Sequence, residues 1–234
     1  MKAAILVGGA GTRLLPLTYY VPKCMIFIGG KPFLDYVIEY LVKHGIDEVI
    51  LLVSNDDYEV FYNYYGNGKR FNVKISYSSG PRTGTAGALH SAKDLLNDTF
   101  LTYYGDVLTD FDLTSMIKFH RTKKSICTLA LSKGVPIEYG VGKTDESGKL
   151  ICFEEKPILH EYPVSMGIYV MEPKVIDFCK PSLDIASDII PTLIRNGLPV
   201  YGYITENPHY DIGTFKHLDM VKRIIEERKK NPKK

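Results

Sequence analysis

Cysteine is scarce in this 234-residue sequence, and its few occurrences follow no metal-binding pattern. There is no C-x-x-C pair, and no cysteine stands at the spacing from histidine that a zinc site requires. We therefore expect a reducing environment in which each cysteine serves as a small hydrophobic residue. The cysteines are Cys24, Cys127, Cys152 and Cys179.

Strong charge of one sign and long apolar runs are missing too. A net charge of +2 at pH 7 is too small to indicate a nucleic-acid or membrane surface. No apolar stretch approaches the roughly 18 residues of a membrane-spanning helix, and residues 1–7 run straight into a glycine-rich loop, which leaves no room for a signal peptide. We expect a cytoplasmic protein that binds neither nucleic acid nor membrane.

Two common phosphate-loop motifs do not occur either. The Walker pattern G-x-x-x-x-G-K-[ST] is absent, since Gly142-Lys143-Thr144 has Ile137 where the first glycine would stand. The dinucleotide fingerprint G-x-G-x-x-G stops at Gly9-Ala10-Gly11, because Leu14 stands in place of the third glycine. A dinucleotide-binding oxidoreductase is therefore a disfavoured alternative, which a screen for NAD(P) binding would test.

Strand-like and helix-like segments alternate through the first half of the chain. Short aliphatic runs predict buried strands, and apolar residues at helical spacing predict helices. We expect strands at residues 1–7, 47–54, 73–78 and 99–107, and helices at 32–44, 58–65, 85–96 and 112–123. This alternation predicts an α/β fold with a doubly wound, mostly parallel, Rossmann-like mixed sheet flanked by helices.

Beyond Ser125 the pattern changes to short strand-like segments separated by turns. These segments predict a mixed sheet and a small β sub-lobe, and helical stretches at 184–196 and 214–229 close the chain. There is no internal repeat and no low-complexity linker. We therefore expect one domain over residues 1–234, with a first half at 1–123 and a second half at 124–234.

One glycine-rich segment is followed at once by fixed cations. It reads GGAGTRLLPLT at residues 8–18, and Pro22-Lys23 follows. The segment resembles the opening motif of the sugar-1-phosphate nucleotidylyltransferases, G-G-x-G-T-R-L-x-P-L-T followed by P-K. Later segments resemble that family's other motifs in order: GTAGAL (84–89) its base-recognition loop, GDV (105–107) its metal aspartate, EEKP (154–157) its sugar site and YDIGT (210–214) its second metal aspartate.

The resemblance implies a transfer of nucleoside monophosphate from a nucleoside triphosphate to a sugar 1-phosphate, with Mg²⁺ as cofactor. The products would be a nucleotide sugar and pyrophosphate. The nucleophile is already an anionic phosphate oxygen, so the reaction needs positioning and charge neutralisation rather than a general base. This agrees with the lack of a Ser-His-Asp or Cys-His arrangement in the sequence. Relatives are often dimers or tetramers, which leaves a homo-oligomer open.

The triphosphate would be held by the bare backbone of the glycine loop and by cations near it. The planar guanidinium of Arg13 suits the departing β- and γ-phosphates, and Lys23 would supply a point charge near the α-phosphate. The candidate catalytic residues are Arg13, Lys23 and Lys156. The candidate nucleotide-binding residues are Leu6, Gly8, Gly9, Gly11, Thr12, Arg13, Arg82, Gly84, Thr85 and Gly105.

By the same resemblance, Asp106 and Asp211 form the Mg²⁺ site together with phosphate oxygens and water. Glu155 would accept hydrogen bonds from sugar hydroxyls, and Lys156 would neutralise the sugar phosphate. In an extended segment these two side chains would face opposite ways. The candidate sugar-phosphate site comprises Tyr139, Gly140, Glu155, Lys156 and Gly167.

The sequence leaves two candidate pairs of nucleoside triphosphate and sugar 1-phosphate open. GTAGAL is familiar from guanylyltransferases, so GTP with mannose 1-phosphate or a related sugar phosphate is the first choice. Pro81 stands where the family usually has an acidic residue, and Arg82 offers donors that also suit uracil or thymine carbonyls. UTP or dTTP with glucose 1-phosphate or another sugar 1-phosphate is the alternative.

An alternative of another class is a catalytically silent subunit that senses nucleotide sugars and regulates a partner. The charged residues of the motifs are all present, which favours activity: Arg13, Lys23, Asp106, Lys156 and Asp211. The sequence ends after one helix, so we expect neither the left-handed β-helix nor the acetyltransferase activity of bifunctional relatives.

Overall fold

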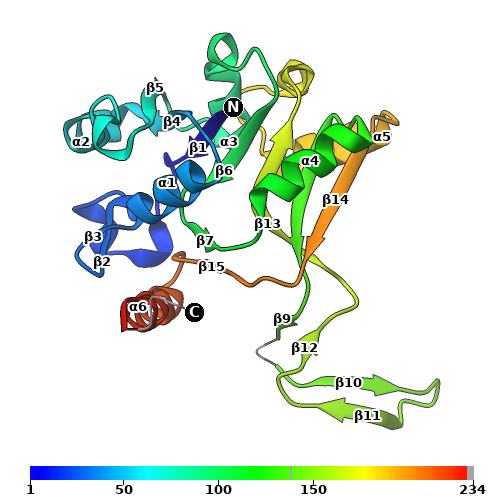
Figure 1. The fold of residues 1–234 in the computed structure, drawn as a ribbon. Helices are drawn as coiled ribbons and strands as arrows, with labels where there is room; N and C mark the ends of the chain where they lie inside the picture. Colours follow the sequence, from blue (N-terminus) through cyan, green and yellow to red (C-terminus); the bar gives the residue numbers. More distant parts are fainter. Residues whose placement is uncertain (138, 231–234) are drawn as a thin grey trace.

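The structure is a computed structural model that describes residues 1–137 and 139–230. A seven-stranded sheet lies at its centre, with smaller strand pairs beside it and helices around it (Figure 1). The strands are β1 (Lys2–Leu6), β2 (Phe27–Ile28), β3 (Lys31–Pro32), β4 (Glu48–Ser54), β5 (Lys74–Gly80), β6 (Phe100–Tyr104), β7 (Val107–Thr109), β8 (Cys127–Ser132), β9 (Val135–Pro136), β10 (Val141–Thr144), β11 (Leu150–Glu154), β12 (Ile158–Leu159), β13 (Val164–Met171), β14 (Val200–Thr205) and β15 (His209–Asp211). The α-helices are α1 (Phe33–Lys43), α2 (Tyr58–Tyr65), α3 (Gly84–Ser91), α4 (Leu113–Lys123), α5 (Ile190–Arg195) and α6 (Phe215–Lys230).

The central sheet has the strand order β14-β8-β13-β6-β1-β4-β5. Strand β13 runs antiparallel to both of its neighbours, and every other neighbouring pair is parallel. The sheet draws β1, β4, β5 and β6 from before residue 123 and β8, β13 and β14 from after it. The expectation of a mostly parallel, mixed α/β sheet is confirmed.

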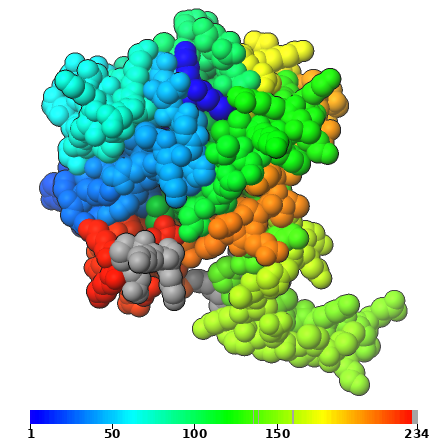
Figure 2. Space-filling view, in the orientation of Figure 1, coloured from blue at the N-terminus to red at the C-terminus, as the bar shows by residue number. Residues whose placement is uncertain are grey.

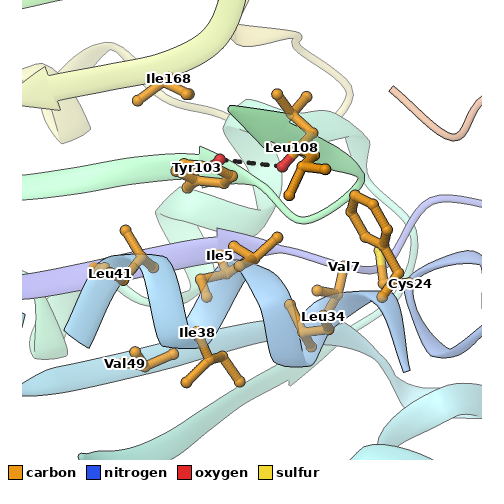
Figure 3. Close-up of a cluster of buried hydrophobic side chains, with 14 of the residues drawn as sticks. Ile5, Val7, Cys24, Leu34, Ile38, Leu41, Val49, Tyr103, Leu108 and Ile168 are labelled. Atoms are coloured by element: carbon orange, nitrogen blue, oxygen red, sulfur yellow. Dashed lines mark hydrogen bonds between the residues drawn. The ribbon is translucent and has the colours of Figure 1, made fainter. Parts of the chain in front are cut away.

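Helices cover both faces of the sheet because alternate strand residues point to opposite sides. On one face, Ile5 of β1 belongs to a buried cluster with residues of α1, α2 and α4, and Figure 3 shows it near Leu34 and Ile38. On the other face, Ala4 belongs to a second cluster with residues of α3 and α5. This is the doubly wound arrangement that the sequence predicts.

A narrow β arm extends from the body of the molecule. Strand β9 pairs with β12 and β10 with β11, all antiparallel (Figure 1). Every residue of β10 and β11 is exposed, and the space-filling view shows the arm standing clear of the body (Figure 2). Cys152 is therefore exposed on β11, against the expectation of a packed hydrophobic residue, whereas Cys24, Cys127 and Cys179 are buried. The arm is the small β sub-lobe that the sequence predicts.

The strand predicted over residues 99–107 is interrupted. Strand β6 ends at Tyr104, and after Gly105 and Asp106 the chain leaves the central sheet as β7. Strand β7 pairs antiparallel with β15, which lies about a hundred residues later in the chain. A buried aliphatic run cannot reveal this break, because the pairing partner is distant in sequence.

Two predicted helices are not continuous α-helices over the expected ranges. The helix over 85–96 ends at Ser91, because Ala92 leaves helical geometry with φ −97° and ψ 9°. The helix over 184–196 begins as a π-helical turn at Ile185–Ile189 and continues as α5. Pro191 has no N–H, so a continuous α-helix would lack the hydrogen bond from this residue to the carbonyl of residue 187.

Helix α6 closes the chain against the first buried cluster. Leu218, Val221 and Ile225 repeat at helical spacing and are buried there. The helix follows β15 directly, so it stands beside the segment that pairs with β7. Among the described residues, no helix is both long and apolar enough to cross a membrane.

Candidate functional site

A cavity of about 520 Å³ opens at the carboxyl ends of β1, β4 and β6, beside the turn that follows β5. Doubly wound sheets bind their ligands at this edge. The cavity is lined by residues 6–10, 52–54 and 81–85 together with Arg13, Lys23, Cys24, Ala88, Tyr104, Asp106 and Asp184. Of the predicted residues it therefore gathers Leu6, Gly8, Gly9, Arg13, Lys23, Arg82, Gly84, Thr85 and Asp106, whereas Gly11, Thr12 and Gly105 do not line it.

The glycine loop has backbone donors that the protein does not use. Within residues 1–137 and 139–230, the N–H groups of Gly8, Gly9, Ala10 and Gly11 have no acceptor in the protein. Gly11 adopts a left-handed φ of +62°, which glycine does without strain, and its carbonyl accepts a hydrogen bond from the Thr18 hydroxyl (2.9 Å). A run of free N–H groups at a cavity wall is suited to an anion such as a phosphate.

Lys23 and Asp106 form an ion pair inside this cavity. Their side chains are only 16% and 18% exposed, so water shields the pair little. The neighbouring Cys24 is buried, and this burial raises the pKa of its thiol. The thiol stays protonated near neutral pH and is therefore not a nucleophile.

Asp211 is brought next to Asp106 by the short pairing of β15 with β7. The register places Asp211 opposite Val107. Immediately after it, the N–H of Ile212 donates a hydrogen bond to the carbonyl of Asp106 (3.1 Å). The two aspartates predicted for a metal site, which are far apart in sequence, are therefore neighbours on one two-stranded ribbon, although Asp211 does not itself line the cavity.

The carboxylate of Asp211 is held by groups on its own side of the ribbon. It accepts a hydrogen bond from the Gly213 N–H (2.6 Å) and lies 3.0 Å from Nδ1 of His217. A Cβ on Gly213 would lie 2.6 Å from Asp211 Oδ1 and 2.9 Å from a terminal nitrogen of Arg13, so Arg13 also stands close by. Partial burial by itself raises the pKa of Asp211, but the hydrogen bonds and the Arg13 charge lower it overall, which keeps the carboxylate ionised.

Asp106 and Asp211 supply ligands suited to a hard divalent cation. Among the described residues, no group of three or more His, Cys, Asp or Glu side chains could hold a metal ion on its own. Mg²⁺ commonly binds one or two carboxylates and takes its remaining ligands from substrate phosphates and water. The donor set therefore fits Mg²⁺ that binds together with a phosphate ligand, and Asp106 is paired with Lys23 in this structure.

Arg82 bridges the glycine loop and the turn that follows β4. Its Nε–H donates to the carbonyl of Gly8 (3.2 Å), and one terminal nitrogen donates to Oγ of Ser54 (3.3 Å) and to Asp57 (2.9 Å). The other terminal nitrogen lies 3.4 Å from Asp56. Arg82 thus lines the cavity, as predicted, with its guanidinium engaged by protein acceptors.

The GTAGAL segment (84–89) begins α3 and is hydrogen-bonded to the second half of the chain. Thr85 Oγ1 donates to Asp184 (2.7 Å) and accepts from the N–H of Ile185 (2.8 Å). Gly84 has a φ of +78°, and a Cβ on it would lie 2.4 Å from the carbonyl oxygen of Leu183. Glycine is therefore required for this close approach of the two segments.

The predicted sugar-site residues lie in two separate places. Gly167 is a bulge position in β13 with a φ of +70°, and a Cβ on it would lie 3.0 Å from the ring of the cavity-lining Tyr104. It therefore stands at the edge of the cavity. The other members, Tyr139, Gly140, Glu155 and Lys156, belong to the arm and do not line the cavity.

On the arm, Gly140 and Glu155 are neighbours, since a Cβ on Gly140 would lie 2.7 Å from Oε2 of Glu155. Glu155 and Lys156 do not lie in an extended segment. Strand β11 ends at Glu154, and Lys156 has a left-handed φ of +52°. Their side chains therefore do not follow the alternation of a strand.

Residues outside the recognised motifs complete the site. Ser54 and Tyr104 line the cavity at the ends of β4 and β6, and their position at the carboxyl ends of predicted strands was a usable signal. Asp57, which accepts a hydrogen bond from Arg82, follows the end of β4. Asp184 and His217 reach the site through contacts between distant segments, for which the sequence has no local signal.

A family model described as "Nucleotidyl transferase" matches residues 2–228. A UTP--glucose-1-phosphate uridylyltransferase of Synechocystis sp. is 38% identical to the chain, over 91% of the chain and 60% of that protein. A mannose-1-phosphate guanylyltransferase of Mycobacterium tuberculosis is 35% identical, over 92% of the chain and 61% of that protein. The chain thus spans about three fifths of the length of these curated relatives.

Solved structures share the fold over nearly the whole chain. One, described as a glucose-1-phosphate thymidylyltransferase from Bacillus anthracis, has a TM-score of 0.77 and 25% identity and covers 96% of this chain and 94% of its own. Another, HddC from Yersinia pseudotuberculosis, has a TM-score of 0.76 and 24% identity and covers 96% and 99%. Both agree with the mostly parallel, helix-flanked sheet described above.

Proposed function

The chain belongs to the nucleotidyl transferase family, and from this premise we propose that it transfers a nucleoside monophosphate from a nucleoside triphosphate to a sugar 1-phosphate. The products are a nucleotide sugar and pyrophosphate. One observation carries the proposal: unpartnered N–H groups at residues 8–10 share a cavity with the cations Arg13 and Lys23 and the carboxylate of Asp106. Such a site binds a polyphosphate and neutralises its charge.

The glycine loop and Arg13 receive the triphosphate. The free N–H groups of Gly8, Gly9 and Ala10 donate to phosphate oxygens along the cavity wall. Arg13 stabilises the negative charge that accumulates on the departing pyrophosphate. These contacts hold the α-phosphorus in line with the attacking oxygen, which is the main requirement of a displacement whose nucleophile is already ionised.

Lys23 neutralises charge at the α-phosphate after its ammonium group has separated from the Asp106 carboxylate. The carboxylates of Asp106 and Asp211 would then hold Mg²⁺, and His217 and Gly213 keep Asp211 oriented and ionised. When bound, this cation would polarise the phosphoryl oxygens and align the donor with the acceptor.

The sugar 1-phosphate binds on the side of the cavity that faces the second half of the chain. Gly167 leaves room beside Tyr104 at this edge. Tyr139, Gly140, Glu155 and Lys156 are proposed to meet the sugar and its phosphate from the arm. In that role Lys156 supplies the cation and Glu155 accepts hydrogen bonds from sugar hydroxyls.

We propose GTP with mannose 1-phosphate as the substrate pair. Many of the similar curated proteins carry that activity in their names, at 35% to 37% identity. UTP with glucose 1-phosphate is the second candidate, because the Synechocystis relative at 38% identity is named for it.

A matrix of four nucleoside triphosphates against several sugar 1-phosphates with Mg²⁺ tests this proposal, with pyrophosphate release as the readout. We expect release from at least one pair, and a loss of roughly 100-fold in Asp106→Asn, comparable to the loss of one preorganised charge-stabilising group. Glu226→Gln, which alters an exposed carboxylate of α6, is the matched control and should keep the wild-type rate. Nucleotide-sugar binding without release from any pair would instead indicate the silent sensor.

A further inference from the structure

The loops after three adjacent parallel strands meet at the side chain of Arg82. Gly8 follows β1, Ser54 ends β4 and Arg82 follows β5, in the order in which these strands pair. The guanidinium contacts Gly8 and Ser54 together with Asp57, and the Ser54 hydroxyl also donates to Asp57 (2.6 Å). A connected set of hydrogen bonds therefore links the glycine loop to the neighbouring loops.

The donors of this guanidinium are almost fully used. A guanidinium has five N–H groups, and the contacts with Gly8, Ser54, Asp57 and Asp56 occupy four of them. One N–H group is therefore left, and a nucleobase could accept a second hydrogen bond from Arg82 only by displacing an existing partner. The Asp57 carboxylate is only 18% exposed, so its ion pair with Arg82 is not easily replaced by water.

The contact with Gly8 constrains the part of the loop that has free donors. In a trans peptide the carbonyl of one residue and the N–H of the next point in opposite directions. Holding the Gly8 carbonyl at Arg82 therefore fixes the direction of the Gly9 N–H. No described residue packs against the side of Gly9 where a side chain would stand, since a Cβ on this exposed residue would have no atom within 4 Å.

We propose that Arg82 is a positioning residue for triphosphate binding, and that Asp57 acts through it. Arg82 keeps the Gly8–Gly9 peptide oriented so that the free N–H groups of the loop present one prearranged set of donors to the phosphates. Asp57 holds the guanidinium in that position. Arg82 thus serves binding of the polyphosphate and does not select the base.

This proposal rests on the proposed function, because it requires that the glycine loop binds a nucleoside triphosphate. Inorganic tripolyphosphate separates the two possible roles of Arg82, since it has the phosphates and lacks a base. Titration calorimetry would measure binding of tripolyphosphate and of each of four nucleoside triphosphates, with Mg²⁺, to the wild type and to Arg82→Gln, Arg82→Lys, Asp57→Asn and Asp56→Asn. Thermal melting would verify that each variant is folded.

We expect Arg82→Gln to weaken tripolyphosphate and all four nucleotides by the same factor, about tenfold, which corresponds to one lost charge-assisted hydrogen bond. Asp57→Asn should weaken all of them in the same way. Arg82→Lys should stay weak, because an ammonium lacks the planar fork that reaches Gly8 and Asp57 together. Asp56→Asn is the matched control, since its carboxylate is 79% exposed and 3.4 Å from Arg82, and it should stay within twofold of the wild type.

In turnover assays the Arg82 and Asp57 variants should raise KM for the nucleotide and leave kcat and KM for the sugar 1-phosphate unchanged. Unchanged tripolyphosphate binding together with altered preference among the nucleotides would overturn the proposal and make Arg82 a base reader. Wild-type affinity in Arg82→Lys would also overturn it. If the wild type bound no nucleoside triphosphate at all, the proposed function itself would fail.

Discussion

Lys23 and Asp106 neutralise each other in the free protein, although the proposed reaction needs both charges for other partners. Removing the ammonium should therefore free the carboxylate for a divalent cation. We predict that Lys23→Gln binds Mn²⁺ about fivefold more tightly in the absence of nucleotide, as expected for the loss of a competing ion pair that contributes roughly 1 kcal/mol. The same variant should release pyrophosphate much more slowly.

Electron paramagnetic resonance of free Mn²⁺ measures this affinity independently of turnover. Lys43→Gln, which removes an ammonium from the exposed end of α1, is the control and should bind Mn²⁺ like the wild type. Equal Mn²⁺ affinity in the wild type and in Lys23→Gln would show that Lys23 does not compete with the cation.

His120 couples folding stability to pH. Its ring is only 1% exposed and contacts Thr128 (2.8 Å) and Glu172 (3.1 Å). Burial lowers the pKa of His120 below its ordinary value of 6.5, despite the opposing effect of Glu172. The imidazole of His120 therefore binds a proton more readily in the unfolded chain than in the folded chain. Its contribution to the free energy of unfolding is fully present above pH 6.5 and decreases as the pH falls below that value.

Urea unfolding at pH 7.5, 6.5 and 5.5 tests this prediction. We expect the wild type to lose up to about 1.4 kcal/mol per pH unit more than His120→Gln does over the lower interval. His160→Gln, which alters an exposed histidine, should keep the wild-type slope. Identical slopes for the wild type and His120→Gln would contradict the assignment.

The positions of site residues follow from the sequence where a motif is contiguous, as for Arg13, Lys23 and Asp106. These residues lie where the motifs suggest, on the wall of one cavity. The partners of Arg82 are different, because Gly8 and Asp57 reach it only through the pairing of β1, β4 and β5. No spacing rule in the sequence predicts such a contact.

At the scale of elements, α6 supports the site through one polar contact and one buried apolar contact. The helix provides His217, which contacts Asp211, and it buries Ile225 at 3% exposure near Gly29. We predict that Ile225→Ala lowers the free energy of unfolding by about 2–5 kcal/mol, the usual cost of truncating a buried isoleucine. The neighbouring exposed Glu226→Ala should change it by less than about 0.5 kcal/mol.

Guanidinium unfolding followed by circular dichroism would measure both variants. A loss of less than about 1 kcal/mol in Ile225→Ala would mean that α6 is not firmly packed on the body. A comparably large loss in Glu226→Ala would show that its carboxylate makes a stabilising interaction that is absent from the structure.

Elements with strong local periodicity were predictable from the sequence. Helix α2 spans Tyr58–Tyr65, as expected, and Asp112 caps α4 by accepting a hydrogen bond from the N–H of Ser115. The break after Tyr104 was not predictable, because it depends on the pairing of β7 with β15. The same pairing brings Asp211 to Asp106, so the feature that local pattern misses is the one that assembles the carboxylates.

At the scale of the whole molecule, the cavity joins the two halves of the chain. Residues 6–10 and 81–85 make up half of its lining residues, and Asp184 comes from the second half of the chain and accepts a hydrogen bond from Thr85. The alternation of strands and helices predicted a doubly wound sheet, and such sheets bind ligands at this edge. It could not predict that the arm with Glu155 and Lys156 stands apart from the cavity.

In the proposed reaction the sugar phosphate displaces pyrophosphate at the α-phosphorus. Incubation of the protein and Mg²⁺ with a sugar 1-phosphate and a nucleoside triphosphate labelled at either the α- or the γ-phosphorus tests it most directly. We predict that the α-label appears in the nucleotide sugar and the γ-label in pyrophosphate. A γ-label recovered in orthophosphate or in the sugar phosphate would contradict the account, because attack would then have occurred at the γ-phosphorus.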